Sequence, residues 1–210
     1  GGIVMSGRDI CHVKDGSTRI IHEDPATPGF NDICVDPDGR VLFGSIRSNP
    51  FTPGDRTPGE LWRAELDGSA AVLYDDVTLC NGIGFSPDGR TLYQSDTGRG
   101  HIVAHDIASD GTVSNRRAFA ATTAPDGLAV DEADNVWVAS YGGGCAVGFD
   151  ADGTEIARVA VPAVQVTSLA FDGRDLYIVT ADNTEDPSRN GTIFHTTVDI
   201  PGLVMPLARV

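Results

Sequence analysis

Apolar and polar residues alternate in short runs along the chain, and each run ends at a cluster of Asp, Gly, Pro or Asn. The pattern is clearest in four segments that align with one another. They are NDICVDPDGRVLFGS (31–45), NGIGFSPDGRTLYQS (81–95), DGLAVDEADNVWVAS (126–140) and, with a one-residue gap at its turn, TSLAFDGRDLYIVT (167–180). Alternation with a period of two on both sides of such a turn is typical of a β-hairpin with one buried face. Each segment is therefore predicted to be a hairpin.

Further strand-like runs lie between these hairpins. They are GELWRAELDG (59–68), HIVAHDIASDG (101–111), CAVGFDADGTEIARVAV (145–161) and GTIFHTTVDI (191–200). About four short strands in each repeat of roughly 40–50 residues is the pattern of a β-propeller. No segment has the 3.6-residue periodicity of an amphipathic helix, so the predicted fold class is all-β.

The number of repeats is small for a closed propeller. A six-bladed ring needs on the order of 270 residues at this period, whereas the chain has 210. Residues 1–21 have the pattern of two outer strands of a blade whose inner part is absent. We therefore expect a single β-propeller domain over residues 1–210, with about four and a half of six blades represented and the N-terminal blade missing.

Composition narrows the class of partner. The formal net charge of −15 argues against a nucleic-acid surface, because phosphate binding requires clustered Lys and Arg, and it disfavours docking on anionic lipid. No apolar run approaches the 18 residues of a membrane span. The cysteines at 11, 34, 80 and 145 lie in or beside apolar runs, which predicts buried free thiols and not disulfides. A cytoplasmic protein, monomeric or homodimeric, is the resulting expectation.

One position of the repeat carries candidate chemistry. The aligned segments begin with Asn31, Asn81, Asp126 and Thr167. Equivalent positions on the innermost strands of a propeller face one another around its central channel. A carboxylate, two amides and a hydroxyl make an all-oxygen set that suits a hard divalent cation, and calcium is the first expectation. The alternative is that these residues only cap turns, but their repetition at one position favours a metal site.

Three motifs also resemble a known family. FNDICVDPDGR, CNGIGFSPDGRTLYQSDT and APDGLAVDEADNVWVASYGGG resemble, in order and spacing, the motifs of the SMP-30/gluconolactonase/luciferin-regenerating-enzyme family. That family has a six-bladed β-propeller with a divalent metal in its tunnel and includes lactone hydrolases. The resemblance implies that Asn81 and Asp126 bind the metal, with Zn²⁺, Mg²⁺ or Mn²⁺ as alternatives to Ca²⁺. It also implies that Asp126 is the general base and that Asn31 and Thr167 contact a lactone substrate.

Two features depart from the family pattern. The family has a metal-binding Glu in its first blade, and nothing in this chain matches that blade. The family often has a substrate-binding Arg two residues before the Asn of FND, where this chain has Gly29. The resemblance therefore does not extend to the preference for sugar lactones associated with that Arg, and a different lactone or ester also fits the sequence.

The leading functional hypothesis is a metal-dependent lactonase in which Asp126 deprotonates the attacking water. Activation of that water by the metal alone stays open. Two other classes also remain: an organophosphate-hydrolysing propeller phosphotriesterase, and a non-catalytic interaction propeller whose metal is structural. Residues 45–62 are rich in Pro and Gly and are predicted to form a loop over the channel mouth. Asp96, in the SDT motif, is interpreted as a turn residue.

Overall fold

The computed structural model describes residues 1–49, 52, 54 and 57–210. They divide into two compact units, of which unit 1 comprises Gly1–Cys80 and Met205–Val210 and unit 2 comprises Asn81–Val204. The described chain is all-β, and its one helical element is the short 3-10 turn η1 (Thr97–Arg99). None of its helical structure is long and apolar enough to cross a membrane. A single domain over 1–210 stays a prediction, since each unit is described by itself.

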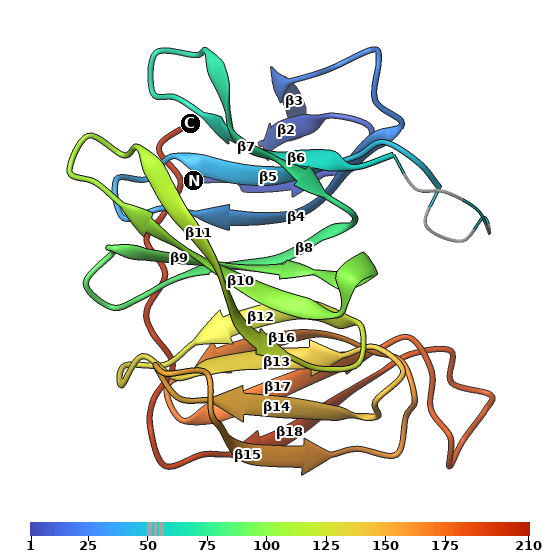
Figure 1. Cartoon of the computed structure of the whole chain (residues 1–210). Coiled ribbons are helices and arrows are strands. Elements are labelled where there is room, and N and C mark those ends of the chain that lie inside the picture. The colour runs from blue at the N-terminus through green and yellow to red at the C-terminus, as the bar shows by residue number, and fades with distance from the viewer. Residues whose placement is uncertain (50–51, 53, 55–56) are drawn as a thin grey trace. The chain divides into compact units, whose positions relative to one another are not determined.

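Unit 1 contains two antiparallel sheets (Figure 1). The first has the order β1 (Ile3–Ser6), β2 (Ile10–Lys14), β3 (Ser17–His22), and the second has the order β4 (Gly29–Val35), β5 (Val41–Ile46), β6 (Gly59–Ala64), β7 (Ala70–Val77). Strands β1 and β4 are in contact. Of the predicted loop 45–62, residues 50–51, 53 and 55–56 lie outside the described part, and both ends of the segment belong to strands β5 and β6.

Unit 2 contains three sheets that follow the chain in order. They are β8 (Cys80–Phe85), β9 (Thr91–Asp96), β10 (His101–Ile107), β11 (Val113–Ala121); then β12 (Pro125–Val130), β13 (Val136–Ser140), β14 (Cys145–Phe149), β15 (Glu155–Ala160); then β16 (Val166–Asp172), β17 (Asp175–Thr180), β18 (Thr192–Thr197). Figure 1 shows β12 beside β16, and these two strands are in contact. Successive antiparallel sheets of this size are the blades of a β-propeller.

The expected blade count was wrong. The described residues form five sheets, not four and a half blades of six. Residues 1–21, expected to give two outer strands, instead give nearly all of a three-stranded sheet. The tight turn at Asp15 and Gly16, whose φ angles are 50° and 76°, separates β2 from β3. The run IVMS before β2 is a strand of its own, β1.

The four predicted hairpins are confirmed as β4–β5, β8–β9, β12–β13 and β16–β17. Aspartates hold several hairpin turns in the same way. Asp36, Asp131 and Asp150 each accept, on Oδ1, the main-chain N–H groups of the residues two and four positions later, at 2.8 to 3.1 Å. These bonds satisfy turn amides that the strands cannot pair, which is why Asp opens such turns.

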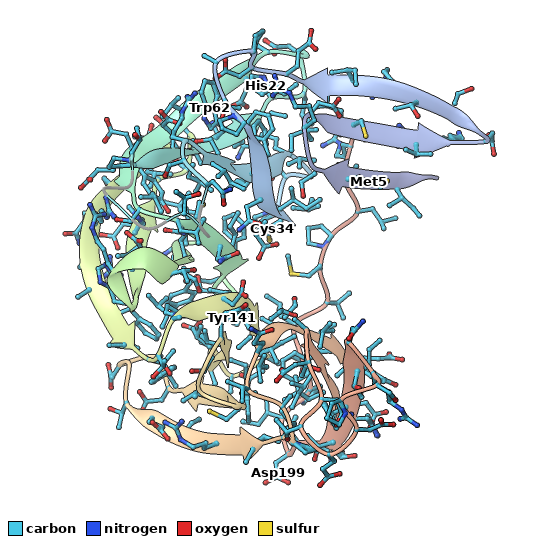
Figure 2. The ribbon with its side chains drawn as sticks, turned by 90° about the vertical axis from the view of Figure 1, so that its right-hand side faces the viewer. Met5, His22, Cys34, Trp62, Tyr141 and Asp199 are labelled. Atoms are coloured by element: carbon cyan, nitrogen blue, oxygen red, sulfur yellow. The ribbon has the colours of Figure 1, made fainter. Side chains whose placement is uncertain are left out.

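The last strand of each four-stranded sheet, β7, β11 or β15, is the most exposed strand of that sheet. Every residue of β8 is buried, whereas β11 and β15 have no buried residue. In unit 1 the core includes Phe43 beside an aromatic group in which the rings of His22 and Trp62 lie 5.0 Å apart (Figure 2). In unit 2 the buried Trp137 donates its indole N–H to Asp131 at 3.2 Å.

All four cysteines are free thiols, as predicted; Cys34, Cys80 and Cys145 are also buried as expected, whereas Cys11 is half-buried. Burial raises the pKa of Cys34 to about 12, and burial also raises the pKa of Cys11. A thiol with a raised pKa is a poor nucleophile at neutral pH, because the thiolate is the reactive form. Neither of these two cysteines therefore suits covalent catalysis.

Candidate active site

The first residue of the repeat lies at an irregularity of the strand pairing in three of the four hairpins. The pairing of β4 with β5 shifts between Phe30 and Ile33, and that of β12 with β13 shifts between Pro125 and Leu128. The pairing of β16 with β17 shifts next to Thr167. A β-bulge inserts an extra residue and redirects a side chain, and bulges are frequent beside active sites. The bulges thus change the direction of the predicted site residues at the strand starts.

The second residue of the repeat lets the inner strands of unit 2 approach closely. A Cβ atom placed on Gly82 would lie 2.5 Å from the carbonyl oxygen of Asp126, and it would also contact the main-chain nitrogen of Leu128. A Cβ atom on Gly127 would lie 3.0 Å from the carbonyl oxygen of Thr167. Both glycines are needed because a neighbouring main chain occupies the space of a side chain.

These close approaches bring three of the four predicted site residues to neighbouring strand starts. Asn81, Asp126 and Thr167 are the second residues of the inner strands β8, β12 and β16, which follow one another along the chain. Asn31 belongs to unit 1 and is described with the residues of that unit. The convergence of Asn81, Asp126 and Thr167 agrees with the sequence analysis, whereas the roles of all four residues stay predictions.

The carboxamide of Asn81 is oriented by a hydrogen bond. Asn81 is 8% exposed, and its Nδ2 donates to the hydroxyl of Thr97 at 2.7 Å. Its Oδ1 lies at the opposite corner of the planar amide and is the acceptor end. Asp126 is half-buried and adds a carboxylate from the neighbouring inner strand β12. The sequence analysis missed Thr97, because the SDT motif contains only the ordinary residues of a turn.

Thr167 and Asn31 have other hydrogen bonds. The hydroxyl of Thr167 donates to the carbonyl oxygen of Val179 at 3.2 Å, within its own sheet. In unit 1, Nδ2 of Asn31 donates to the carbonyl oxygen of Cys80 at 2.8 Å. Contact of either residue with substrate stays a prediction of the sequence.

The donor set can be compared with the needs of a cation. Among the described residues, no group of three or more His, Cys, Asp or Glu side chains is arranged to hold a metal ion. Calcium takes six to eight oxygen ligands, including carboxylates and amide carbonyls. Asn81 and Asp126 supply oxygens of both kinds, so they fit a hard cation in the type of ligand and provide part of its coordination.

The surroundings of Gly29 give a steric reason why this position holds no arginine. A Cβ atom on Gly29 would lie 2.7 Å from the carbonyl oxygen of Gly7, which also accepts the main-chain N–H of Phe30 at 2.7 Å. Position 29 is therefore closed to an arginine side chain unless the Gly7 turn moves.

A charged network lies at the end of β5, beside Gly29. Gly29 pairs with Ile46, and the next residue, Arg47, forms ion pairs of 2.9 Å with Asp24 and with Glu60. Burial raises the pKa of Glu60, but hydrogen bonds from Arg47 and Ser45 outweigh burial and hold this pKa below its usual value. The charge of Arg47 is thus already neutralised, and this residue does not replace the missing arginine as a free cation.

Asp96 is buried and forms an ion pair with Arg99, with Nη1 and Oδ2 2.9 Å apart. It is the last residue of β9 and directly precedes η1, so it lies at the turn to which the sequence analysis assigned it. The pair fixes the segment that carries Thr97.

Comparison with known proteins adds the following findings. A family model described as SMP-30/Gluconolactonase/LRE-like region matches residues 3–182. The chain is 36% identical over 197 residues to pentonolactonase XacC of Haloferax volcanii, a match that covers 89% of this chain and 62% of that protein. It is 34% identical over 227 residues to 6-deoxy-6-sulfogluconolactonase of Pseudomonas putida, with 99% of this chain and 77% of that protein covered.

A solved structure has the same fold. The luciferin-regenerating enzyme superposes with a TM-score of 0.88 at 24% identity, covering 99% of this chain and 77% of that one. At this identity the likeness supports the β-propeller fold.

Proposed function

The chain belongs to the SMP-30/gluconolactonase/LRE-like family, and on that premise we propose that it hydrolyses a lactone at a metal site formed by Asn81 and Asp126. The observation that carries the proposal is the close approach of β8 and β12 at these two residues, with the Asn81 amide nitrogen bonded to Thr97. Two relatives that are more than 30% identical are named as lactonases of sugar-derived lactones. This chain covers only part of their length, so the activity of the whole protein is part of the proposal.

The reaction requires one water molecule and the transfer of one proton. The water oxygen bonds to the lactone carbonyl carbon, the ring C–O bond breaks, and the product is a hydroxy acid. We assign to the Asp126 carboxylate the removal of a proton from the attacking water and its delivery to the departing ring oxygen. When bound, a calcium ion would supply Lewis-acid polarisation of the carbonyl group.

The proposed ligands of that ion are the Asn81 carboxamide oxygen and the Asp126 carboxylate. Calcium is proposed over zinc because the ligands at this position are oxygens. The closed position 29 favours a substrate class other than the one that the family arginine would select, and a panel of five- and six-membered lactones tests this point.

The test measures acid release from lactones with a pH indicator. The purified chain should hydrolyse at least one lactone, lose activity with EGTA and recover it with added calcium. Asp126→Asn should lower turnover by about 100-fold or more, since a general base contributes about 10²–10⁴. The matched control is Asp172→Asn, which alters an exposed aspartate at the far end of β16 and should retain wild-type turnover.

The proposal fails if Asp126→Asn retains wild-type turnover or if no lactone is hydrolysed. Turnover of a fluorophosphate but of no lactone would favour the phosphotriesterase class.

A further inference from the structure

The hydroxyl of Thr97 links the two residues to which we assign the metal. It accepts a hydrogen bond from Nδ2 of Asn81 at 2.7 Å and donates one to the carbonyl oxygen of Pro125 at 2.6 Å. Pro125 directly precedes Asp126, and its carbonyl belongs to the peptide that joins the two residues. One side chain on the segment after β9 therefore contacts the Asn81 amide and the main chain that carries Asp126.

The chemistry of the three groups fixes the direction of both bonds. A carbonyl oxygen only accepts, so the hydroxyl proton of Thr97 must point to Pro125. The Thr97 oxygen then presents lone pairs to Asn81, which can satisfy them only with its NH₂ group. The other orientation of the amide would place Oδ1 against the Thr97 oxygen without a proton between them. Thr97 thereby selects the orientation in which Oδ1 of Asn81 faces away from it.

The main chain around Thr97 is held on both sides. Before it, Asp96 is buried and paired with Arg99. After it, Gly100 has the left-handed conformation (φ 71°), and its N–H donates to the carbonyl oxygens of Asp96 and Thr97 at 3.0 and 3.2 Å. A left-handed φ favours glycine, so the turn is closed by a residue suited to it. The hydroxyl is therefore presented from a fixed position.

This arrangement is not a general feature of the repeat. The residues aligned with Thr97 in the other three repeats are Arg47, Gly142 and Asp182. In unit 1, the amide of Asn31 reaches the carbonyl oxygen of Cys80 directly. The Asn81 amide, in contrast, is linked to the carbonyl oxygen of Pro125 through the Thr97 hydroxyl. Turn formation alone therefore does not account for a threonine at position 97.

We propose that Thr97 is a positioning residue that holds the Asn81 carboxamide in the orientation in which its oxygen faces away from Thr97 and can act as a calcium ligand, and that Thr97 also fixes the peptide before Asp126. The proposal rests on the proposed function for the identity of the metal site. It also predicts an effect that is separate from catalysis, because the orientation of an amide affects calcium binding in the absence of substrate.

The experiment compares Thr97→Val, which removes the hydroxyl at nearly constant volume, with Thr97→Ser, which keeps it. Calcium affinity is measured by isothermal titration calorimetry without substrate, and kcat and KM are measured on the best lactone. Thr97→Val should weaken calcium binding about tenfold, whereas Thr97→Ser should stay within about twofold of wild type. At subsaturating calcium, Thr97→Val should lower kcat, and saturating calcium should restore most of it.

Thr27→Val is the matched control for a general loss of stability. Thr27 is 2% exposed, and its hydroxyl also donates to a main-chain carbonyl oxygen, that of Ile46 at 2.7 Å. Both valine variants should melt at a lower temperature than wild type in the presence of EGTA. Only Thr97→Val should bind calcium more weakly.

The outcomes separate the two proposals. Wild-type calcium affinity in folded Thr97→Val, or a wild-type chain that binds no calcium, overturns the role of Thr97. Calcium binding that depends on Thr97 in a chain that hydrolyses no lactone supports the positioning role and overturns the proposed function.

Discussion

Gly127→Ala tests the close approach of β12 and β16 on which the site geometry depends. The added methyl carbon would lie 2.7 Å from Oγ of Ser168, 2.9 Å from Cα of Ser168 and 3.0 Å from the carbonyl oxygen of Thr167. Ordinary contacts of a methyl carbon are about 3.5–4.0 Å, so the two strands must separate by roughly half an ångström or more. Two of the three opposing atoms are main chain, and a change of side-chain rotamer cannot relieve them.

Overpacking of this kind costs about 1–3 kcal/mol. For a chain of this size, Tm falls by roughly 2–4 °C for each kcal/mol, so we expect Tm to fall by roughly 2–12 °C. Because the movement occurs next to Asp126, we also expect weaker calcium binding. Thermal melts followed by circular dichroism measure the first effect, and titration calorimetry measures the second.

The matched control is Gly7→Ala, where an added Cβ atom would have no neighbour within 4 Å. This variant should melt within about 1–2 °C of wild type, because a surface substitution usually changes stability by less than 0.5 kcal/mol. The double variant Gly127→Ala with Ser168→Gly should recover only part of the loss, since it removes Oγ but not the two main-chain contacts. A Gly127→Ala protein with the Tm and calcium affinity of wild type would refute the close approach of the strands.

Two further predictions concern stability and substrate choice. Burial, together with the positive charges of Arg116 and Arg117, lowers the pKa of His105 to about 4, whereas this pKa is about 6.5 in an unfolded chain. As the pH falls, the unfolded state therefore takes up a proton before the folded state does. The free energy of unfolding should drop by about 2 kcal/mol between pH 8 and pH 5 because of this group. Urea unfolding at both pH values measures the drop, which His105→Gln should reduce; an unchanged pH dependence would contradict the assignment. Gly29→Arg should destabilise the protein by about 1–3 kcal/mol without raising kcat/KM for sugar lactones, and a stable variant with a raised kcat/KM would show that position 29 is open.

The sequence predicted the hairpins well because all four have the first of two local signals and several also have the second. Apolar residues alternate on both sides of the turn, and an aspartate such as Asp36 or Asp131 bonds to the turn amides. Both signals lie within about fifteen residues of the chain, so no knowledge of distant contacts is needed.

Two of the outer strands, β7 and β11, lie outside every run that the sequence predicted, for a physical reason. Strands β7 and β11 are largely exposed, so little selects apolar residues on one face, and the alternation that identifies a strand is weak. β11 has the sequence VSNRRAFAA, in which four polar residues in a row separate Val113 from the apolar residues at the end. Its place as the last strand of a sheet follows from pairing with β10, which no local pattern encodes.

The residues of the candidate site likewise divide into those that a sequence pattern identifies and those that depend on distant contacts. Asn81 and Asp126 could be selected from the sequence because they repeat at one position. Thr97 could not, since its role depends on the carbonyl oxygen of Pro125, 28 residues away, and hydroxyls are common in turns. The closure of position 29 likewise depends on the Gly7 carbonyl, a contact between two glycines that carries no sequence signal.

The chain has two tryptophans, and each unit contains one of them. Trp62 lies in unit 1 against the ring of His22, whereas Trp137 lies in unit 2, bonded to Asp131 and packed against Gly148. The molecule therefore carries a separate intrinsic fluorophore for each half. Replacing either tryptophan by phenylalanine leaves an emission signal that reports on one unit alone, so the unfolding of the two units can be followed independently without an added label.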